Sequence, residues 1–551
     1  MQPYKIVSAD VLIIGSGVSG LRAAAAAAET GATVSLVSKG PSASPEIMGF
    51  NAPVHTEDSI SQYIDDMQNS ADGICDSQLV RTMAQNIAGE IAYMESIGLN
   101  FDKTPQGDYD AIHTLGTKYP RLIHYRSSTG VKEMELLKRH CDALGVAFYI
   151  PVDILDLLVE KGKVAGAFGW DTGNQTVLVF KAKAVVLATG GCGAMQFSTT
   201  YPRTIIGDGY AMAFKAGARL IDMEFQQFEP CCFVYPPQIE GKVIATTLLR
   251  HGATLRNGLG EEFMGNYGLT RENAQKSTLA RAMVAEVAAG RGTPHNGIYY
   301  DLTMMGEKFL YEDHAIFTRP AVEANIDLTR QMPEMMPAAH TCLGGIEVDC
   351  DCSCAVEGLF ACGEVIGGLH GANRIGGSAG AETVVFGGIA GKSAAAYAKT
   401  AIQETDSKQL AQNVQMLLKA LLSNPKSQGN LQDVQMRINK LLSAKVGIAR
   451  SEEGLLEAME EVAALKKELA ACHATSIKAA ASLYHVENML LIASVQIGAS
   501  LLRKESRGVF FRDDYPVRDE AWSRNIIAQL CSGEIEFIVA SKNSQARSIA
   551  I

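Results

Sequence analysis

Residues 9–40 read ADVLIIGSGVSGLRAAAAAAETGATVSLVSKG, and three local patterns follow one another in them. VLIIG is an apolar run of strand length, and LRAAAAAAET is rich in alanine, which loses the least entropy on entering a helix. Gly31 stands where a left-handed residue ends such a helix, and TVSLVS has the composition of a second strand. The stretch therefore predicts a β-α-β unit.

The first turn of this unit has the spacing G-x-G-x-x-G. Its six residues are Gly15, Ser16, Gly17, Val18, Ser19 and Gly20. Glycines at this spacing let the backbone approach a pyrophosphate at a helix N-terminus, where free N–H groups and the helix dipole favour an anion. Between a strand and a helix, the motif predicts that these residues bind a dinucleotide. The alternative is a glycine-rich turn in an unrelated α/β fold.

The end of the second strand bears on which dinucleotide is bound. NAD-binding folds usually place Asp or Glu there, whereas this chain has Ser38 and Lys39. Two later strands also end in glycines: KAKAVVLATGGCG contains Ala188, Thr189, Gly190 and Gly191, and VEGLFACGEV contains Gly363 and Glu364. Three separated, glycine-punctuated strands that share one sheet are typical of FAD-binding domains. The pattern favours FAD over NAD, with these residues among the contacts.

The rest of the chain predicts two further domains. The glycine-punctuated pattern is missing over roughly 230–341, which predicts an inserted α+β capping domain. After residue 400, apolar residues recur at helical spacing with charges between them, as in DVQMRINKLLSAKVGIARSEEGLLEAMEEVAALKKELAA, which predicts helices. The expected fold is α/β, with a Rossmann-like FAD-binding domain, the inserted cap and a C-terminal helical domain. The expected boundaries are 1–229 with 342–400 for the FAD-binding domain, 230–341 for the cap, 401–505 for the helical bundle and 506–551 for a tail.

Composition argues against several classes of protein. The net charge is −11 and no basic patch stands out, so the chain is a poor nucleic-acid binder, because phosphate neutralisation needs clustered Lys and Arg. The N-terminus has no export signal, and no run of about 18 apolar residues predicts a membrane-spanning helix, so we expect a cytoplasmic protein without direct membrane insertion. The twelve cysteines are expected to be thiols. The cluster CDCSC (Cys350, Cys352 and Cys354) lacks Cys-x-x-Cys spacing, so no metal site is predicted.

Longer segments resemble a known family along nearly the whole chain. They are DVLIIGSGVSGLRAA, ATGG, GDGYAMAFKAGARLIDMEFQQF, PAAHTCLGGIEVD, VEGLFACGEV, HGANRIGG and ESRGVFFRDDYPVRD. These are similar to the flavoprotein subunits of succinate dehydrogenase and fumarate reductase, and to their relative L-aspartate oxidase. The resemblance implies FAD and hydride transfer between flavin N5 and the carbon skeleton of a small carboxylic acid, next to a carboxylate.

The resemblance also implies roles for individual residues. Arg374 in HGANR matches the arginine that grips a substrate carboxylate, a task that suits a planar guanidinium. His340 in AAHTCLGG matches a substrate-binding histidine, Arg281 in STLARAM matches the arginine that exchanges a proton, and Arg250 matches the other end of the proton relay. Further implied contacts are Thr246, Thr247 and His370 for the substrate, and Asp208, Arg374 and Ser378 for the cofactor.

The chain departs from the family pattern at one half of the substrate site. Glu229 in QFEP replaces a histidine of the family's QFHP, and Thr246–Thr247 replaces a Thr-Glu pair that supplies the central acid of the relay. Glu229 is a candidate catalytic residue with Arg281 and Arg250, and four interpretations of it stay open. It accepts from a cation or donor at the far end of the substrate, it lines the cap beside a larger neutral end, it serves Arg281 in place of the relay acid, or it pairs with a nearby arginine and touches no ligand.

The sequence also bears on how FAD is attached, on the electron-transfer partner and on alternative activities. The loop SKGPSASPEIMGFNAP is shorter than in the family and has no histidine, so the covalent flavin link of succinate dehydrogenases has no candidate there and FAD is expected to be non-covalent. The chain has no Cys-x-x-Cys ladder, so we expect an iron–sulfur or ferredoxin-like electron-transfer partner, with any membrane reached only through partner subunits. Two alternatives remain: an L-aspartate oxidase, and a non-catalytic protein that carries electrons within a complex.

Overall fold

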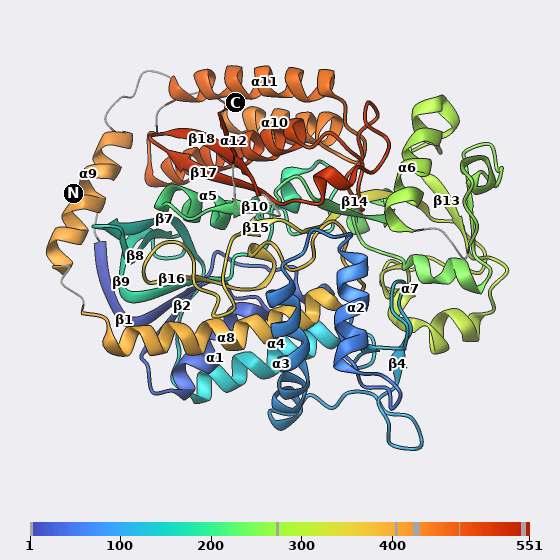
Figure 1. The fold of residues 1–551 in the computed structure, drawn as a ribbon, viewed down its shortest axis with the longest axis horizontal. Coiled ribbons are helices and arrows are strands. Elements are labelled where there is room, and N and C mark those ends of the chain that lie inside the picture. The colour runs from blue at the N-terminus through green and yellow to red at the C-terminus, as the bar shows by residue number, and fades with distance from the viewer. Residues whose placement is uncertain are drawn as a thin grey trace.

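The computed structural model describes residues 4–271, 275–402, 406–422, 430–472, 474–540 and 547–550. Its largest sheet has seven strands in the order β6-β2-β1-β9-β8-β7, with β16 added beside β9. The strands are β1 (Tyr4–Ile14), β2 (Val34–Val37), β6 (Ala147–Tyr149), β7 (Val152–Glu160), β8 (Lys163–Asp171), β9 (Thr176–Leu187) and β16 (Leu359–Ala361). Figure 1 shows this sheet on the left of the molecule.

The three glycine-punctuated strands lie side by side in this sheet. β1 pairs in parallel with β9, and β9 pairs in parallel with β16. Because the carboxyl ends of parallel strands meet at one edge, the glycines that follow these strands gather there. The expected return of the chain to one FAD-binding sheet is confirmed. The β-α-β unit is confirmed too, with α1 (Val18–Glu29) as its helix.

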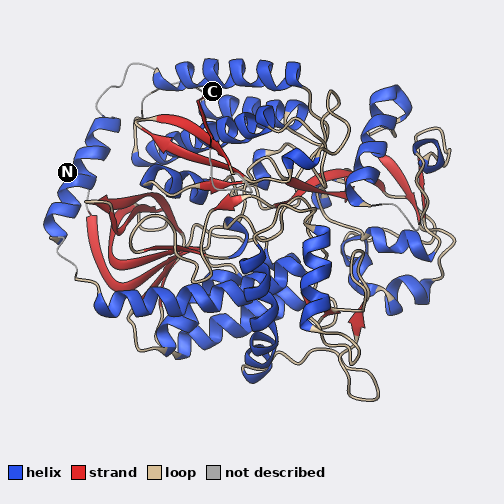
Figure 2. Cartoon of the chain, viewed as in Figure 1, coloured by secondary structure: helices blue, strands red, loops and turns tan. Residues whose placement is uncertain are grey.

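Helices cover one face of the sheet. α1, α3 (Ser77–Ser96), α4 (Thr129–Ala143) and α8 (Ser378–Thr400) lie together below it in Figures 1 and 2. α1 and α8 pack closely because both carry small residues at the contact. Ala23 of α1 is fully buried, and a Cβ added to Gly391 of α8 would meet the Ala23 carbonyl oxygen at 2.1 Å. The alanine run therefore serves close packing as well as helix formation.

Residues 226–342 build a four-stranded antiparallel sheet in the order β11-β14-β13-β12. Its elements are β11 (Gln226–Phe233), β12 (Thr254–Arg256), α6 (Lys276–Glu286), β13 (Ile298–Asp301), α7 (Ala315–Glu323) and β14 (Glu334–Cys342). Apolar residues of this segment form a hydrophobic cluster of their own, which includes Phe233, Leu255 and Met335. Figure 1 shows the unit at the right of the molecule. The expected boundaries after residues 229 and 341 fall inside β11 and β14, so strands of this sheet lead directly into the FAD-binding part.

The described residues of the C-terminal part form four α-helices: α9 (Ser407–Leu422), α10 (Leu431–Lys445), α11 (Glu452–Ala470) and α12 (Ile477–Leu502). In Figure 1, α9 lies beside the large sheet and the other three lie above it. Among the described residues, α12 alone is long and apolar enough to cross a membrane by length and composition. However, 72% of its apolar window is buried inside the protein. This is weak evidence for a membrane span, because the core helix of a folded domain has the same properties.

The expected tail, 506–551, joins the rest of the fold through strands. β17 (Ile526–Cys531) pairs with β10 (Leu220–Ile221), in a five-stranded sheet of order β15-β10-β17-β18-β19. The other strands are β15 (Gly345–Ile346), β18 (Glu534–Val539) and β19 (Arg547–Ala550). One sheet thus connects residues before the cap, residues after it and the C-terminus, while 541–546 and 551 lie outside the described residues. A small sheet of β3 (Phe50–Asn51), β5 (Leu122–Ile123) and β4 (Ala111–Ile112) and the helices α2 (Ile60–Ser70) and α5 (Asp208–Ala216) surround the core.

Candidate active site

A cavity of about 1190 Å³ lies where the edge of the large sheet, the cap and the C-terminal segment meet. Its wall includes the β1–α1 turn, the loop 40–49, the start of α6 and part of the segment 506–518. Pockets for drug-sized ligands measure roughly 300–1,000 Å³. The volume is therefore large enough for a cofactor together with a small substrate.

The β1–α1 turn presents glycine backbone and a helix N-terminus to the cavity. Gly15, Ser16, Gly17 and Ser19 line the wall. Gly15 has a φ of +121°, and a Cβ there would meet the Ala188 carbonyl oxygen at 2.1 Å, so only glycine fits this turn. The N–H of Val18 donates to Oγ of Ser44 at 3.0 Å, but α1 has no acidic residue in its first turn, so its positive end still favours an anion. This part of the wall fits the pyrophosphate of FAD.

Several predicted cofactor residues lie behind the wall and support it. The wall includes Ser38, Lys39, Ala188, Thr189, Gly190, Asp208, Glu364 and Arg374, but not Val18, Gly20, Gly191, Gly363 or Ser378. A Cβ on Gly20 would meet the Gly15 carbonyl oxygen at 2.1 Å, and one on Gly363 would meet Ser19 Oγ at 2.5 Å. Their small size lets the residues on the wall take up their positions.

A buried ion cluster holds Lys39 at the end of β2. Its Nζ lies 2.6 Å from Oδ2 of Asp208, and Oδ1 of Asp208 contacts His485 and Asn488 of α12 at 3.0 and 2.9 Å. Burial favours a higher pKa for Asp208, but Lys39 and His485 hold it well below its usual range. Burial favours a lower pKa for His485, but Asp208 and Asp153 raise it to about 9. The imidazolium of His485 therefore ties the C-terminal helices to the cofactor wall.

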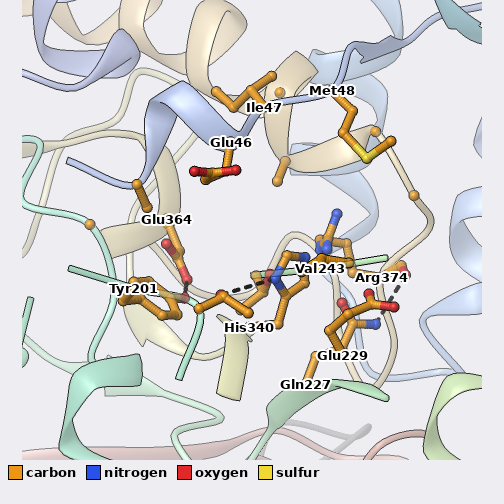
Figure 3. Close-up of a pocket in the computed structure, with 18 of the residues that line it drawn as sticks. Glu46, Ile47, Met48, Tyr201, Gln227, Glu229, Val243, His340, Glu364 and Arg374 are labelled. Atoms are coloured by element: carbon orange, nitrogen blue, oxygen red, sulfur yellow. Dashed lines mark hydrogen bonds between the residues drawn. The ribbon is translucent and has the colours of Figure 1, made fainter. Parts of the chain in front are cut away.

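Glu364 is part of the cavity wall, and its burial sets its protonation state. One of its carboxylate oxygens accepts hydrogen bonds from the Tyr201 hydroxyl and from the Cys342 N–H, the latter at 2.9 Å. Burial raises the pKa of Glu364 to about 7, although both hydrogen bonds oppose the shift. Figure 3 shows Tyr201 and Glu364 joined at one side of the pocket. Near neutral pH, this carboxyl group therefore takes up and releases a proton.

Arg374 presents a donor group with no protein partner. Its guanidinium is buried, and its Nη1 donates to the Ile375 carbonyl at 3.3 Å. Its Nε has no hydrogen-bond partner among the residues that the structure describes. Leaving a buried donor unpaired costs about 1–3 kcal/mol. A carboxylate bound in the cavity would accept from it.

His340 is a neutral group beside this arginine. It lies on β14, and its Nδ1 is 3.2 Å from Oγ1 of Thr200. Burial lowers the pKa of His340 well below its usual value, and the positive charges of Arg374 and Lys276 lower it further. His340 can therefore exchange hydrogen bonds with a ligand but adds no charge to the site. Figure 3 shows His340, Arg374 and Glu229 around the same space.

Glu229 forms an ion pair with a lysine of the cap. It lies on β11 opposite Ala338 of β14, and its Oε2 contacts Nζ of Lys276, the first residue of α6. The side chain of Lys276 is 33% exposed, against 3% for Glu229. Oε1 of Glu229 is buried and has no partner within the described ranges. Of the four interpretations, pairing with a nearby cation agrees best with this geometry, with lysine in place of arginine.

The two arginines expected for proton transfer, Arg281 and Arg250, line the same cavity. Thr246 and Thr247, which were expected to contact the substrate, line it too. The Cζ of Arg281 lies 4.3 Å from the centre of the Phe511 ring. Burial lowers the pKa of Arg281, while Asp513 opposes that shift. Arg281 therefore sits at the cavity wall with its guanidinium over an aromatic face, an arrangement that fixes its plane.

His370 does not belong to the wall. Its Nε2 lies 2.9 Å from Oε2 of Glu382 in α8, and both side chains are buried. The residue is absent from the cavity lining. Its neighbour by four positions, Arg374, faces the cavity instead. The structure therefore places His370 in an internal hydrogen bond with Glu382 and not at the cavity, where a substrate contact was expected.

Three residues of the cavity wall were not predicted from the sequence. Tyr201, Lys276 and Phe511 each line the cavity. Lys276 stands five positions before Arg281 on α6, which turns the two side chains about 140° apart around the helix, so helical spacing gave no signal that both line one wall. Tyr201 and Phe511 carried no comparable signal, because each meets its partner only through the tertiary fold.

Comparisons with known proteins agree with this site. A family described as FAD binding domain matches residues 10–379, and one described as Fumarate reductase flavoprotein C-term matches 435–543. The fumarate reductase (CoM/CoB) of Methanothermobacter marburgensis has a subunit that is 33% identical over 537 residues, which cover 95% of this chain and 97% of the relative. L-aspartate oxidase from Yersinia pestis is 30% identical over 529 residues, which cover 92% and 96%. The quinol fumarate reductase of E. coli superposes with a TM-score of 0.87 at 27% identity, covering 100% of this chain and 97% of that one.

The glycine turn at the cavity and the extent of these matches lead to one assignment. The matched segments span both the FAD-binding sheet and the C-terminal part, and the glycine turn that the structure places at the cavity lies inside the first of them. The chain therefore belongs to the family of FAD-dependent oxidoreductases that includes the flavoprotein subunits of fumarate reductase and succinate dehydrogenase and the L-aspartate oxidases.

Proposed function

We propose that this protein transfers hydride between FAD and a small carboxylic acid, at the carbon–carbon bond next to a carboxylate. The observation that carries the proposal is Arg374. Its buried Nε lacks a partner among the described residues, and it lines the same cavity as the β1–α1 turn. A guanidinium binds a carboxylate through paired, charge-assisted hydrogen bonds. Arg374 would thus hold the acid in the cavity that also holds FAD.

Other residues of the cavity wall exchange the proton, orient the acid and exclude water. Bound FAD supplies the hydride donor or acceptor. In the reducing direction, the acid gains a hydride at one carbon and a proton at the neighbouring carbon, and oxidation removes both. Arg281 exchanges the proton, which its lowered pKa favours, with Arg250 behind it in the relay. Neutral His340 orients the acid, and the cap (230–341) excludes water.

Reoxidation of reduced flavin tests this function. The FAD-loaded protein is photoreduced without oxygen, and the flavin absorbance is followed after addition of fumarate and of other unsaturated acids. We expect at least one acid to reoxidise the flavin, and R374M to slow that reaction at least about tenfold, because charge-assisted hydrogen bonds are lost. The control is R437M, since Arg437 pairs with Glu461 and Glu468 outside the cavity. No spectral response to any carboxylate would refute the proposal.

The attachment of FAD is proposed to be non-covalent. The loop 40–49 lines the cavity along its whole length and contains no histidine. Precipitation with acid should therefore release all flavin into the supernatant. Flavin fluorescence that stays with the denatured polypeptide would contradict the proposal.

An iron–sulfur or ferredoxin-like protein is the proposed electron partner. The fumarate reductase relative is itself one subunit of an enzyme, and the CDCSC segment has Cys352 and Cys354 buried with Cys350 half-buried. Within the described residues no cluster of His, Cys, Asp and Glu could hold a metal ion, so electrons must leave through another molecule. Purification from the source organism without oxygen should retain an iron-containing partner, and any membrane contact should depend on partner subunits.

Two other activities are less well supported. An L-aspartate oxidase needs an acceptor for the substrate ammonium, but Oε2 of Glu229 already contacts Lys276 and its Oε1 is buried. Aspartate-dependent peroxide formation would establish that activity. A non-catalytic electron carrier has no use for the unpartnered donor of Arg374. Unchanged activity of the whole complex with R374M would favour such a role.

A further inference from the structure

The start of α6 forms a second cationic surface in the cavity, apart from Arg374. Gln275, Lys276, Ser277 and Thr278 all line the wall. The helix has no acidic residue in its first turn and no side-chain cap from the described residues. Its first N–H groups and its dipole therefore favour an anion at this point. The ammonium of Lys276 adds a full charge to the same place.

Lys276 and Arg374 both act on His340. The pKa of His340 falls well below its usual value through burial first, and then through the charges of Arg374 and Lys276. All three residues line the same cavity, so both positive charges act on the space beside His340.

Glu229 stands behind Lys276 and holds it. The carboxylate is almost completely buried, whereas a third of the lysine side chain is exposed. An ammonium has three N–H donors, and Glu229 uses only one oxygen for the contact. The other donors of Lys276 stay available to the cavity. Within this pair, a ligand in the cavity contacts Lys276, and Glu229 holds Lys276 in place.

We propose that Lys276 binds the second carboxylate of a dicarboxylate substrate, and that Glu229 is a positioning residue that aims it. This inference rests on the proposed function, in which Arg374 binds the first carboxylate, and it names the substrate class. The acid in QFEP then does not exclude fumarate-like substrates. Glu229 supports Lys276, and Lys276 takes the place of the family's histidine as the group that binds the second carboxylate.

Equilibrium binding to the oxidised, FAD-loaded protein tests the inference without turnover. The probes are fumarate, with two carboxylates, and crotonate, in which a methyl group replaces one of them. Binding is read from the change in flavin absorbance. The central comparison is E229Q against the double variant E229Q/K276M. Both lack the Glu229 charge, so neither leaves a buried carboxylate unpaired, which could unfold the protein.

We expect the double variant to bind fumarate roughly 10-fold to 100-fold more weakly than E229Q, because hydrogen bonds to a charged partner are lost. The Kd of crotonate should stay the same. E229Q alone should shift the Kd of fumarate more than that of crotonate, because Glu229 directly contacts Lys276 and reaches Arg374 only through its charge. The control is K445M, which breaks a Lys445–Glu457 pair of the helical part and should change neither Kd. Equal losses for both acids, or no loss for fumarate, would overturn the inference.

R374M separates failure of the inference from failure of the proposed function. If Arg374 binds the first carboxylate, R374M weakens the binding of both fumarate and crotonate. If R374M has that effect but the loss of Lys276 does not weaken fumarate binding selectively, only the inference fails. If R374M changes neither Kd, or if the wild type binds neither acid, the proposed function fails and the inference fails with it.

Discussion

The hydroxyl of Tyr201 donates to a carboxylate oxygen of Glu364, and both residues line the cavity. Burial raises the pKa of Glu364 to about 7, from a usual value of 4.5. Between these two pH values the folded protein keeps a proton that the unfolded chain releases. The contribution of Glu364 to stability is therefore complete below pH 4.5 and is lost as the pH rises through 7.

The variant E364Q should abolish this contribution, since an amide does not titrate. We expect the flavin-free wild type to lose on the order of 3 kcal/mol more stability than E364Q between pH 4.5 and pH 7.5. Urea denaturation at several pH values measures the difference, and the variant serves as its own reference for all other groups. Parallel stability curves for the two proteins would show that folding does not raise the pKa of Glu364.

Two helical glycines should respond oppositely to alanine. A Cβ on Gly20 in α1 would meet the Gly15 carbonyl oxygen at 2.1 Å, whereas one on Gly89 in α3 would meet nothing within 4 Å. G89A should gain up to about 1 kcal/mol of stability, because alanine favours a helix. G20A should lose stability and FAD affinity, because the β1–α1 turn must open. Thermal unfolding and FAD titration measure both, and equal behaviour of the two variants would contradict the steric argument.

Arg281 should affect turnover more than binding. R281K keeps the charge but loses the planar group that stacks on Phe511. We expect kcat to fall roughly 100-fold, a loss typical for general acid–base groups, with little change in the Kd of fumarate. F511L should produce a smaller loss of the same kind. R437K is the control, and a change in Kd without a change in kcat would assign Arg281 to binding instead.

Alkylation should distinguish the cysteines by burial. Nine of the twelve are buried, and Cys75, Cys350 and Cys531 are partly exposed. Burial raises the pKa of Cys75 to about 11, so its reactive thiolate is scarce at pH 8. Iodoacetamide at pH 8 should therefore label Cys350 before Cys75 and leave the nine buried thiols intact until denaturant is added. Mass spectrometry of peptides decides this, and early labelling of Cys352 or Cys354 would contradict their burial in the fold.

Local patterns predicted the part of the fold that binds FAD. The β-α-β unit of residues 9–40 needs only the order of apolar, small and glycine residues, and the shared sheet of β1, β9 and β16 followed from repeated glycine endings. The strands of the C-terminal segment were not predicted. β17 pairs with β10, from a distant part of the chain, and such long-range pairing leaves no local pattern.

The site was predicted unevenly for a similar reason. Arg374 and His340 stand in motifs that sequence alone makes visible, and both line the cavity. His370 stands in the same motif as Arg374, yet it pairs with Glu382, because successive residues of a loop point in different directions. The role of Glu229 depended on Lys276, 47 positions later in the chain. No spacing rule connects a strand residue with the first residue of a distant helix.

The pairing of β10 with β17 has a consequence for biosynthesis. Leu220 is paired with Ala528, so on the ribosome the middle sheet stays open until residue 528 has emerged. The cavity wall includes Arg507, Phe511 and Arg518 of the same late segment. A nascent chain can therefore fold its N-terminal β-α-β unit early, but it cannot enclose a cofactor. The complete cavity for FAD therefore requires that residue 518 has emerged, and a chain that stalls before it cannot form that cavity.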